Sequence, residues 1–248
     1  MSKVITILGG NGYIGRRCIN SVLDLDENVK VNVISRSGTI SSGKVYKFDT
    51  RVRFIKGDCL NPDSFSHIIQ DSTGIIHSIG ALLTTKPDND PGSYNMMNKE
   101  SCLRVANIAN SVQGKKINFV YISSAAGLPF PLSIPFGKYI ITKRQTEEEL
   151  IKMKNLNTVL LRPGFVVDAK DRGFSIPLKF PVDGLNMLDN LVIKKFSKSL
   201  SDSLVLPAKS IQLEVLAGYA AAGCLGQLQT RIYSNEEMIE NYKNLNRH

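Results

Sequence analysis

The chain has 248 residues, a hydrophobic fraction of 42%, a charged fraction of 21% and a formal net charge of +9. These values are ordinary for a soluble globular protein, and no apolar stretch reaches the roughly 18–20 residues that a membrane-spanning helix needs. The basic residues are dispersed and the chain has no Trp, so we expect no nucleic-acid partner.

The first elements read as a strand, a glycine-rich turn and an amphipathic helix. Residues 4–8 form a continuous apolar run, as in a strand buried on both faces of a parallel sheet. After the glycines, four residues share one helical face: Ile14, Cys18, Val22 and Leu25. Because this strand begins directly after Lys3, we expect residues 1–15 to belong to the fold and not to a removable leader.

Strands and helices then alternate up to about residue 165. Further strands are predicted at 30–35, 52–56, 74–78, 117–123 and 158–162. Helices are predicted at 61–70, where Asn61 would cap and Pro62 would begin the helix, and at 97–112 and 138–153. This alternation predicts an α/β protein with a doubly wound parallel sheet, the NAD(P)-binding Rossmann fold.

The predicted organisation is one structural unit with two parts. Residues 1–165 would form the Rossmann domain, and residues 166–248 a small C-terminal lobe, for substrate or as a lid, packed on it. Residues 215–225 are apolar and rich in Ala and Gly, which favours a buried helix.

The turn after the first strand has the spacing of a dinucleotide-binding motif. Gly9, Gly12 and Gly15 would allow a tight turn, a close approach of pyrophosphate and close helix–strand packing. The helix start would offer free N–H groups and a positive dipole end to the anion; the alternative is a turn without a ligand. Seven consecutive residues are predicted to contact the cofactor: Gly9, Gly10, Asn11, Gly12, Tyr13, Ile14 and Gly15.

The end of the second predicted strand indicates which dinucleotide binds. An acidic residue there would suit the ribose hydroxyls of NAD, but the chain has Ser35 and Arg36. A guanidinium suits a 2′-phosphate, so we expect NADP, with NAD as the alternative cofactor. The alternative role for Arg36 is to stack on the adenine or to face solvent. Asp58 is placed for the adenine amino group, and Ser78 and Gly80 for the adenosine ribose. Helix capping is the alternative role for such polar residues.

A Tyr-x-x-x-Lys pair lies in the helix predicted after the fifth strand. Tyr139 and Lys143 would share one helical face, and a nearby ammonium lowers the pKa of a phenol. Lys143 would also hold the nicotinamide ribose. Ser124 is predicted to hydrogen-bond the reacting oxygen, with Ser123 as the fallback, and Asn98 to anchor a proton-relaying water. The alternative is that Lys143 pairs with Glu147 on the surface.

No metal site is expected. The four cysteines and three histidines are scattered, and neither set has the spacing of zinc ligands. We therefore expect the cysteines to be reduced and mostly buried thiols.

In this order the glycine turn, Ser124, the Tyr139–Lys143 pair and Arg162-Pro163-Gly164 resemble the extended and atypical short-chain dehydrogenase/reductases. The resemblance covers residues 4–225. In that family the Tyr, Lys and Ser have the roles given above, and the Asn belongs to the proton relay. The resemblance also adds Pro163 to the predicted cofactor contacts.

A closer similarity is to the branch that contains the 39-kDa accessory subunit of respiratory complex I, and within it to fungal mitochondrial accessory proteins of ubiquinone biosynthesis. The matching segments are residues 9–15, 35–38, 77–80, 94–99, 121–123 and 162–165. The resemblance implies residence on the matrix side of the mitochondrial inner membrane. It also implies association with the assembly that makes coenzyme Q.

Two functions remain open. In the first, an NADP-dependent oxidoreductase reduces a quinone precursor or another hydrophobic carbonyl. Apolar residues would then line a pocket or form a small core under the lid: Phe165, Phe174, Phe180, Leu185, Met187, Leu188 and Leu191. In the second, a non-catalytic assembly or regulatory subunit binds nucleotide and contacts partners or the membrane. Residues 191–200 would then rest on anionic lipid through Lys194, Lys195 and Lys198, unless they form a solvated helix face.

Overall fold

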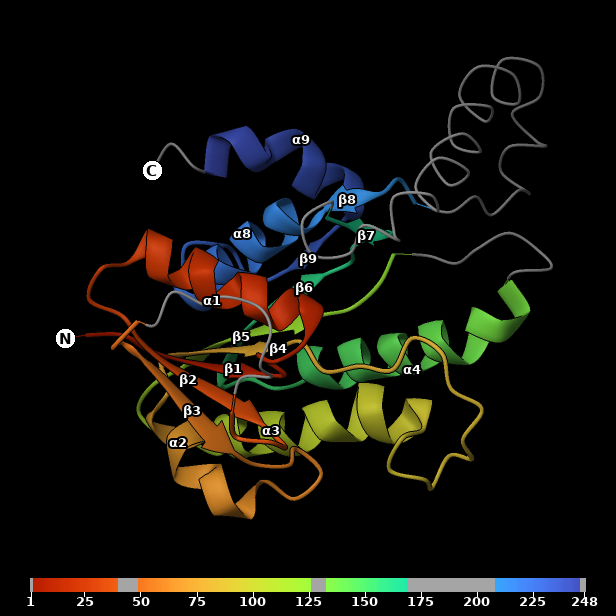
Figure 1. Ribbon diagram of the computed structural model, residues 1–248, viewed down its shortest axis with the longest axis horizontal. Helices are drawn as coiled ribbons and strands as arrows, with labels where there is room; N and C mark the ends of the chain where they lie inside the picture. Colours follow the sequence, from red (N-terminus) through yellow and green to blue (C-terminus); the bar gives the residue numbers. More distant parts are fainter. Residues whose placement is uncertain (1, 40–48, 126–132, 169–207, 246–248) are drawn as a thin grey trace.

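A seven-stranded parallel sheet forms the centre of the computed structural model, which describes residues 2–39, 49–125, 133–168 and 208–245 (Figure 1). The strand order is β3-β2-β1-β4-β5-β6-β9. The bounds are β1 (Val4–Leu8), β2 (Lys30–Ser35), β3 (Val52–Lys56), β4 (Gly74–His77), β5 (Ile117–Ile122), β6 (Leu156–Leu161) and β9 (Ile232–Tyr233). The predicted doubly wound Rossmann fold is confirmed, and the strand order reverses between β1 and β4, where such folds bind ligands.

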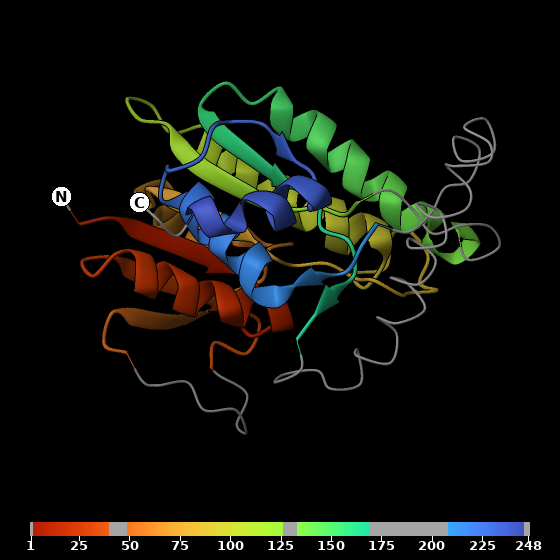
Figure 2. The same cartoon turned by 90° about the horizontal axis from the view of Figure 1, so that it is seen from above.

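Helices cover both faces of this sheet (Figures 1 and 2). On one face lie α1 (Tyr13–Leu25) and α8 (Leu213–Cys224), with α9 (Asn235–Leu245) packed on α8. On the other lie α2 (Ser66–Asp71), α3 (Ser101–Asn110) and α4 (Ser133–Ile151). Each layer has its own buried apolar cluster, because strands such as β1 point Ile5 and Ile7 to one face and Leu8 to the other.

The apolar helix predicted at residues 215–225 is confirmed as α8. Ten of its twelve residues are buried, since it packs on the sheet and on α1 at once. Its small residues permit this closeness: a Cβ at Gly223 would lie 2.9 Å from Cγ2 of Val120.

The described residues after 165 return to the central sheet. β9 pairs in parallel with β6, and β7 (Val166–Val167) pairs with β8 (Ile211–Gln212) in a second, two-stranded sheet. Thus α8 and β9, which fall within the predicted C-terminal lobe, contribute to the Rossmann unit itself. Residues 169–207 lie outside the described residues, together with the predicted pocket-lining side chains from Phe174 to Leu191 and the basic apolar segment 191–200. The lid role of this stretch stays a prediction.

Several predicted helix boundaries differ from the structure. The side chain of Asn61 makes no capping bond; Pro62 instead begins a 3-10 turn, η1 (Pro62–Phe65), that continues into α2. A turn of π-helix, η2 (Asn95–Glu100), precedes α3, and α4 begins at Ser133, five residues before the predicted start. Leu25 is 37% exposed, so the buried face of α1 ends at Val22.

Candidate functional site

The glycine turn joins β1 to α1 in a conformation that side chains would block. Gly9 has a φ of +82°, and a Cβ at Gly15 would lie 2.4 Å from the backbone oxygen of Gly9. The N–H of Gly12 donates to that same oxygen at 2.8 Å. Gly12 precedes α1, no side chain caps the helix, and its first turn holds no acidic residue. The first N–H groups of α1, in the turn that starts with Tyr13 and Ile14, therefore suit an anion.

Asn11 fastens this turn to the loop after β2. Its Nδ2 atom donates to Ser35 Oγ at 3.0 Å and to Ser37 Oγ at 2.9 Å, and it also contacts the backbone oxygen of Thr39. Gly10 lies against β2, since a Cβ there would meet Cγ1 of Val33 at 2.3 Å. The glycine turn and the segment that carries Arg36 thus form one rigid edge.

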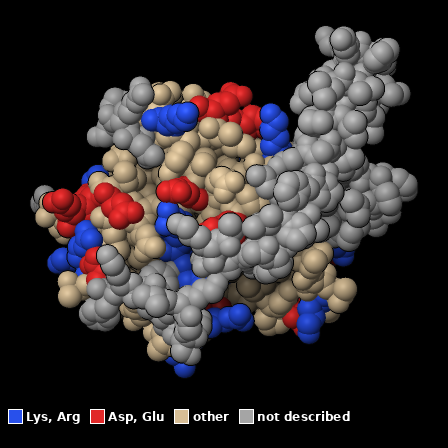
Figure 3. Space-filling view, turned by 45° about the horizontal axis from the view of Figure 1, so that its top comes forward, with Lys and Arg blue, Asp and Glu red and all other residues tan. Residues whose placement is uncertain are grey.

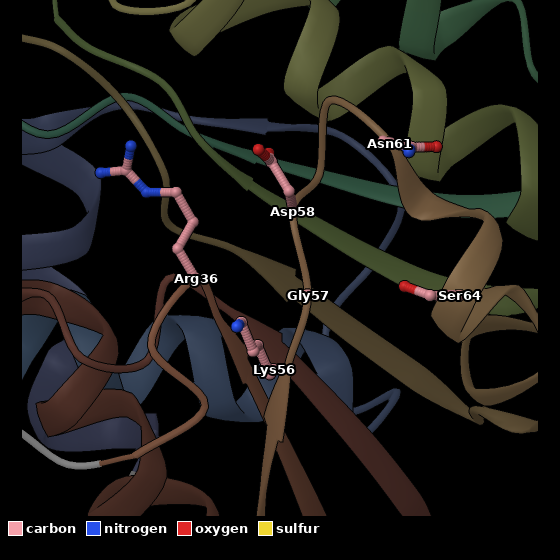
Figure 4. A pocket seen from close by; sticks show the side chains of 6 residues that line it. All are labelled: Arg36, Lys56, Gly57, Asp58, Asn61 and Ser64. Atoms are coloured by element: carbon pink, nitrogen blue, oxygen red, sulfur yellow. The ribbon is translucent and has the colours of Figure 1, made fainter.

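A cavity of about 470 Å³ opens at the carboxyl ends of β2 and β3 (Figure 4). It is lined by Arg36, Lys56, Gly57, Asp58, Asn61 and Ser64. The side chains of Arg36 and Asp58 extend to the same side of the loops that carry them (Figure 4), and Lys56 pairs across the sheet with Ser35, the residue before Arg36. The carboxylate of Asp58 accepts a bond of 3.0 Å from the N–H of Leu60, which holds its loop.

Ser78 and Gly80 form the turn after β4. Ser78 donates to the backbone oxygen of Leu8 at 2.8 Å, and a Cβ at Gly15 would lie 2.8 Å from its hydroxyl. A Cβ at Gly80 would lie 2.8 Å from Oδ1 of Asn98 and 3.3 Å from Nζ of Lys143. Only glycine lets the chain pass this close to both side chains.

The structure brings Ser124 and Tyr139 together. The Ser124 side chain lies near enough to the Tyr139 phenol to oppose the rise in its pKa, and the ring of Tyr94 meets that of Tyr139 edge-on at 6.2 Å. Burial raises the pKa of Tyr139, and this outweighs the opposing effects of the Ser124 side chain and the Arg144 charge. The expected lowering of the Tyr139 pKa is therefore not found, because desolvation penalises the phenolate more than these groups favour it.

Lys143 lies beneath Tyr139, almost fully buried at 3% exposure. Its Nζ atom donates to the backbone oxygen of Ile122 at 2.8 Å and sits 4.6 Å from the centre of the Tyr121 ring. Burial lowers the pKa of Lys143 to about 8. The alternative of a surface pair with Glu147 is wrong, since Glu147 is 2% exposed and its ion pairs go to arginines.

Asn98 is fully buried in the π-helical turn η2. Its side chain accepts from the N–H of Ala81 at 2.8 Å and donates to the oxygen of Ala81 at 3.2 Å. Its backbone oxygen accepts from Tyr121 at 2.7 Å and from Thr146 at 3.2 Å. Asn98 therefore fixes the loop after β4 beside Lys143, and its water-anchoring role stays a prediction.

A family model described as NAD(P)H-binding matches residues 9–181, more than half of the chain. The protein belongs to this NAD(P)H-binding family. The match begins at the glycine turn and runs through the segment that carries Ser124, Tyr139 and Lys143.

Relatives and solved structures agree with that assignment. MIOREX complex component 2 of Saccharomyces cerevisiae is 27% identical over 86% of this chain and 90% of its own length. The Bordetella bronchiseptica enzyme WbmG in complex with NAD shares the fold with a TM-score of 0.61 at 18% identity, over 99% of this chain and 77% of that one. The UDP-N-acetylglucosamine 4-epimerase of Methanobrevibacter ruminantium does so with a TM-score of 0.63 at 19% identity, over 94% and 76%. The predicted NAD(P)-binding family and Rossmann fold are confirmed.

In this NAD(P)H-binding protein, several site residues were missed from the sequence. Lys56 could have been found from its position as the last residue of β3, next to the end of β2 that carries Arg36. Arg144 and Glu147 carried no signal beyond a helical i, i+3 spacing, which is typical of exposed pairs. In the structure Arg144 and Arg162, both partly exposed, form a cluster around the buried Glu147.

Ser123 and Pro163 flank that cluster. Ser123 donates to Oε1 of Glu147 at 2.5 Å, so the fallback serine faces away from Tyr139. The backbone oxygen of Pro163 accepts from Ala125 at 2.7 Å, which ties the end of β6 to the loop after β5. The cofactor contact predicted for Pro163 stays a prediction.

Within the described residues no three metal-ligating side chains come together. All four cysteines are free and buried, as predicted, and burial raises the pKa of Cys18 and of Cys59 to about 12. None is therefore activated as a thiolate.

The surface carries mixed charge on the face drawn in Figure 3, where basic and acidic side chains are interspersed. In the part of the chain that the structure describes, no helix is both long and apolar enough to cross a bilayer.

Proposed function

We propose that the protein is an NADP(H)-dependent oxidoreductase that reduces a hydrophobic carbonyl or a quinone in mitochondrial ubiquinone biosynthesis. The observation that carries the proposal is the convergence of Ser124, Tyr139 and Lys143 beyond the carboxyl end of β5. In a Tyr-x-x-x-Lys pair on an exposed helix face the lysine would be solvated, whereas Lys143 is almost fully buried with its Nζ atom 5.8 Å from the centre of the Tyr139 ring.

The chain's own residues supply the proton chemistry of such a reduction. When bound, the nicotinamide would supply a hydride to the substrate. Ser124 would orient the substrate oxygen, and Tyr139 would donate the proton that this oxygen needs. The phenol of Tyr139, whose pKa is raised, is protonated at neutral pH, which is the state that a proton donor needs. Lys143 would hold the ribose next to this pair.

The cavity at β2 and β3 supports NADP over NAD. Arg36 and Lys56 place two cations beside it, and the end of β2 lacks the acidic residue that would repel a 2′-phosphate. Asp58, on the other side of the opening, would accept a hydrogen bond from the adenine amino group. The pyrophosphate would lie against residues 9–15 and the start of α1.

The proposed setting is the matrix side of the mitochondrial inner membrane, in association with the assembly that makes coenzyme Q. It is supported by the resemblance of residues 9–15, 35–38, 77–80 and 94–99 to the ubiquinone-biosynthesis branch. The yeast relative is named as a component of the MIOREX complex, which agrees with a protein that works inside an assembly.

That relative also favours a second candidate, a non-catalytic nucleotide-binding subunit of such an assembly. In this case the dinucleotide would act as a structural element that joins the glycine turn to the loop after β2, which Asn11 already ties together. Tyr139 and Lys143 would then contribute packing only.

The two candidates predict different outcomes for two variants. In the reductase, Tyr139→Phe should lower NADPH-dependent turnover of short-chain quinones or aromatic aldehydes by about 10²–10⁴-fold and leave NADPH binding intact. In the subunit, Tyr139→Phe should have no effect on coenzyme Q production in cells, while Gly12→Asp, which blocks the nucleotide, should abolish it. Tyr233→Phe, a tyrosine on the far strand β9, is the matched control. Unchanged coenzyme Q production in Tyr139→Phe cells would contradict the reductase.

A further inference from the structure

A cluster of charged side chains adjoins Ser124 and Tyr139. Its centre is the almost fully buried Glu147, which accepts hydrogen bonds from Nη1 of Arg144 at 2.6 Å and from Nη2 of Arg162 at 2.5 Å. By contrast, the Lys152–Glu149 pair near the end of the same helix is exposed. Burying the Glu147 carboxylate costs free energy, which its attraction to the two partly exposed guanidinium groups offsets. A buried carboxylate at this position points to a more specific task than tying α4 to the sheet.

The cluster contacts two neighbouring serines, Ser123 through its hydroxyl and Ser124 through its backbone. Ser123 donates to Glu147 at 2.5 Å and accepts from Nη1 of Arg144 at 3.3 Å. The other terminal nitrogen of Arg144, Nη2, donates to the backbone oxygen of Ser124 at 2.8 Å. The hydroxyl of Ser123 is thus held inside the cluster. Arg144 contacts Ser124 through its backbone oxygen, and the Ser124 side chain acts on the Tyr139 phenol.

The guanidinium of Arg144 is held by the carboxylate of Glu147 at Nη1 and by the backbone oxygen of Ser124 at Nη2. Arg162 fixes Glu147 in turn, because its Nε atom donates to both carboxylate oxygens at 3.0 and 3.2 Å. These contacts join α4 to the ends of β5 and β6, the three elements that meet at the site. A planar guanidinium can bond a carboxylate and a carbonyl at once, whereas a lysine presents a single compact charge.

We infer that Arg144 is a positioning residue that holds the backbone of Ser124 so that the Ser124 hydroxyl faces Tyr139. The inference rests on the proposed function only for the role of Tyr139 as proton donor. Arg144 also brings a positive charge that favours the phenolate left when Tyr139 gives up its proton.

The test is the 13Cζ NMR resonance of Tyr139 in the full-length protein labelled with [13Cζ]tyrosine, assigned by its loss in Tyr139→Phe. Ser124→Ala removes the hydroxyl that acts on Tyr139 and sets the scale of the displacement. Arg144→Lys keeps the charge but cannot bond Glu147 and Ser124 together, so it should reproduce most of that displacement. Arg231→Lys is the matched control, because Arg231 forms an Arg–Glu pair with Glu237 on the surface.

The inference is overturned if Arg144→Lys leaves the Tyr139 resonance in place while Ser124→Ala moves it; the cluster then only ties α4 to the sheet. Should Arg144→Lys fail to fold, Ser123→Ala remains, which removes one hydroxyl. It should leave the resonance unmoved, and a displacement as large as that of Ser124→Ala would overturn the assignment of the two serines. Calorimetry with NADPH and turnover assays run in parallel, so an inactive but correctly positioned tyrosine contradicts the proposed function and leaves this inference standing.

Discussion

The Nζ atom of Lys143 donates a 2.8 Å hydrogen bond to the backbone oxygen of Ile122, whereas the ion pairs of the neighbouring Glu147 go to Arg144 and Arg162. Burial lowers the pKa of Lys143 to about 8, so the ammonium begins to lose its proton just above neutral pH. An anionic dinucleotide whose ribose accepts from Nζ would favour the ammonium and raise this pKa.

We therefore expect Lys143 to take up a proton when NADPH binds between about pH 8 and 9. The uptake should reach at most about one proton per chain. Calorimetric titrations in buffers with different ionisation enthalpies measure this uptake. It should fall away below pH 7, where Lys143 is already charged, and vanish in Lys143→Met. Equal uptake by Lys143→Met and the parent would show that another group is responsible.

His77 links the same site to acid stability. It is fully buried, and burial together with the charge of Lys143 lowers the pKa of His77 from 6.5 to about 3. Between these values the unfolded chain binds a proton that the folded chain does not, so stability is complete above pH 6.5 and is lost as the pH falls. The loss amounts to at most about 1.4 kcal/mol per pH unit.

Urea unfolding at pH 7.0 and 5.5 measures this effect. His77→Gln should reduce the stability difference between the two pH values by about 1–2 kcal/mol, and His67→Gln, which removes an exposed imidazole, is the control. A pH dependence that survives His77→Gln would mean that His77 is not the responsible group.

The glycine turn should tolerate substitution at one position and not at another. A Cβ at Gly12 meets only the oxygen of Gly9, at 3.0 Å, whereas one at Gly15 would overlap two backbone atoms at 2.4 and 2.8 Å. Gly12→Asp should therefore fold, with a melting temperature near that of the parent, and fail to bind NADPH because its carboxylate repels the phosphates. Gly15→Ala should be strongly destabilised.

Gly137→Ala is the matched control for these variants, since a Cβ there meets nothing within 4 Å. It lies in α4, where Ala is favoured over Gly by about 0.5–1 kcal/mol, so its melting temperature should rise. Tight NADPH binding by Gly12→Asp would place the phosphates elsewhere.

Cofactor choice should depend on two cations. Arg36→Gln and Lys56→Gln should each weaken NADPH binding by about tenfold, or ~1.4 kcal/mol, and leave NADH binding unchanged within about twofold. Arg53→Gln removes an equivalent exposed charge from β3 and should change neither affinity. Equal losses for NADPH and NADH would indicate that the two cations contact a part of the cofactor common to both.

Much of the fold follows from local pattern. The first six strands were predicted within two residues of their bounds, because most of them are largely apolar runs that a parallel sheet buries on both faces. β9 was missed because its two residues, Ile232 and Tyr233, are too few to show a period. The π-helical turn at Asn98 was also not predicted. The hydroxyls of Tyr121 and Thr146 donate to the Asn98 backbone oxygen there, and such tertiary contacts do not show in local helix propensity.

The sequence predicted which residues meet at the site, but it did not predict the directions of their pKa shifts or their ion pairs. Spacing alone placed Tyr139 above Lys143, and strand ends placed Ser124 near them. The direction of the Tyr139 pKa depends on burial, which spacing does not report. Likewise, Glu147 lies four residues after Lys143 as an ordinary surface pair would, and only tertiary packing turns it toward Arg144 and Arg162.

The return of the chain to the central sheet has a consequence for biosynthesis. A ribosome that has released only residues 1–165 presents an α1 whose apolar side lacks α8 and a β6 whose outer backbone lacks β9. Such a nascent chain exposes an unpaired strand edge on β6 and an apolar surface on α1, and both promote aggregation. Folding can finish only after about seventy further residues emerge, and until then the growing polypeptide would depend on chaperones for protection.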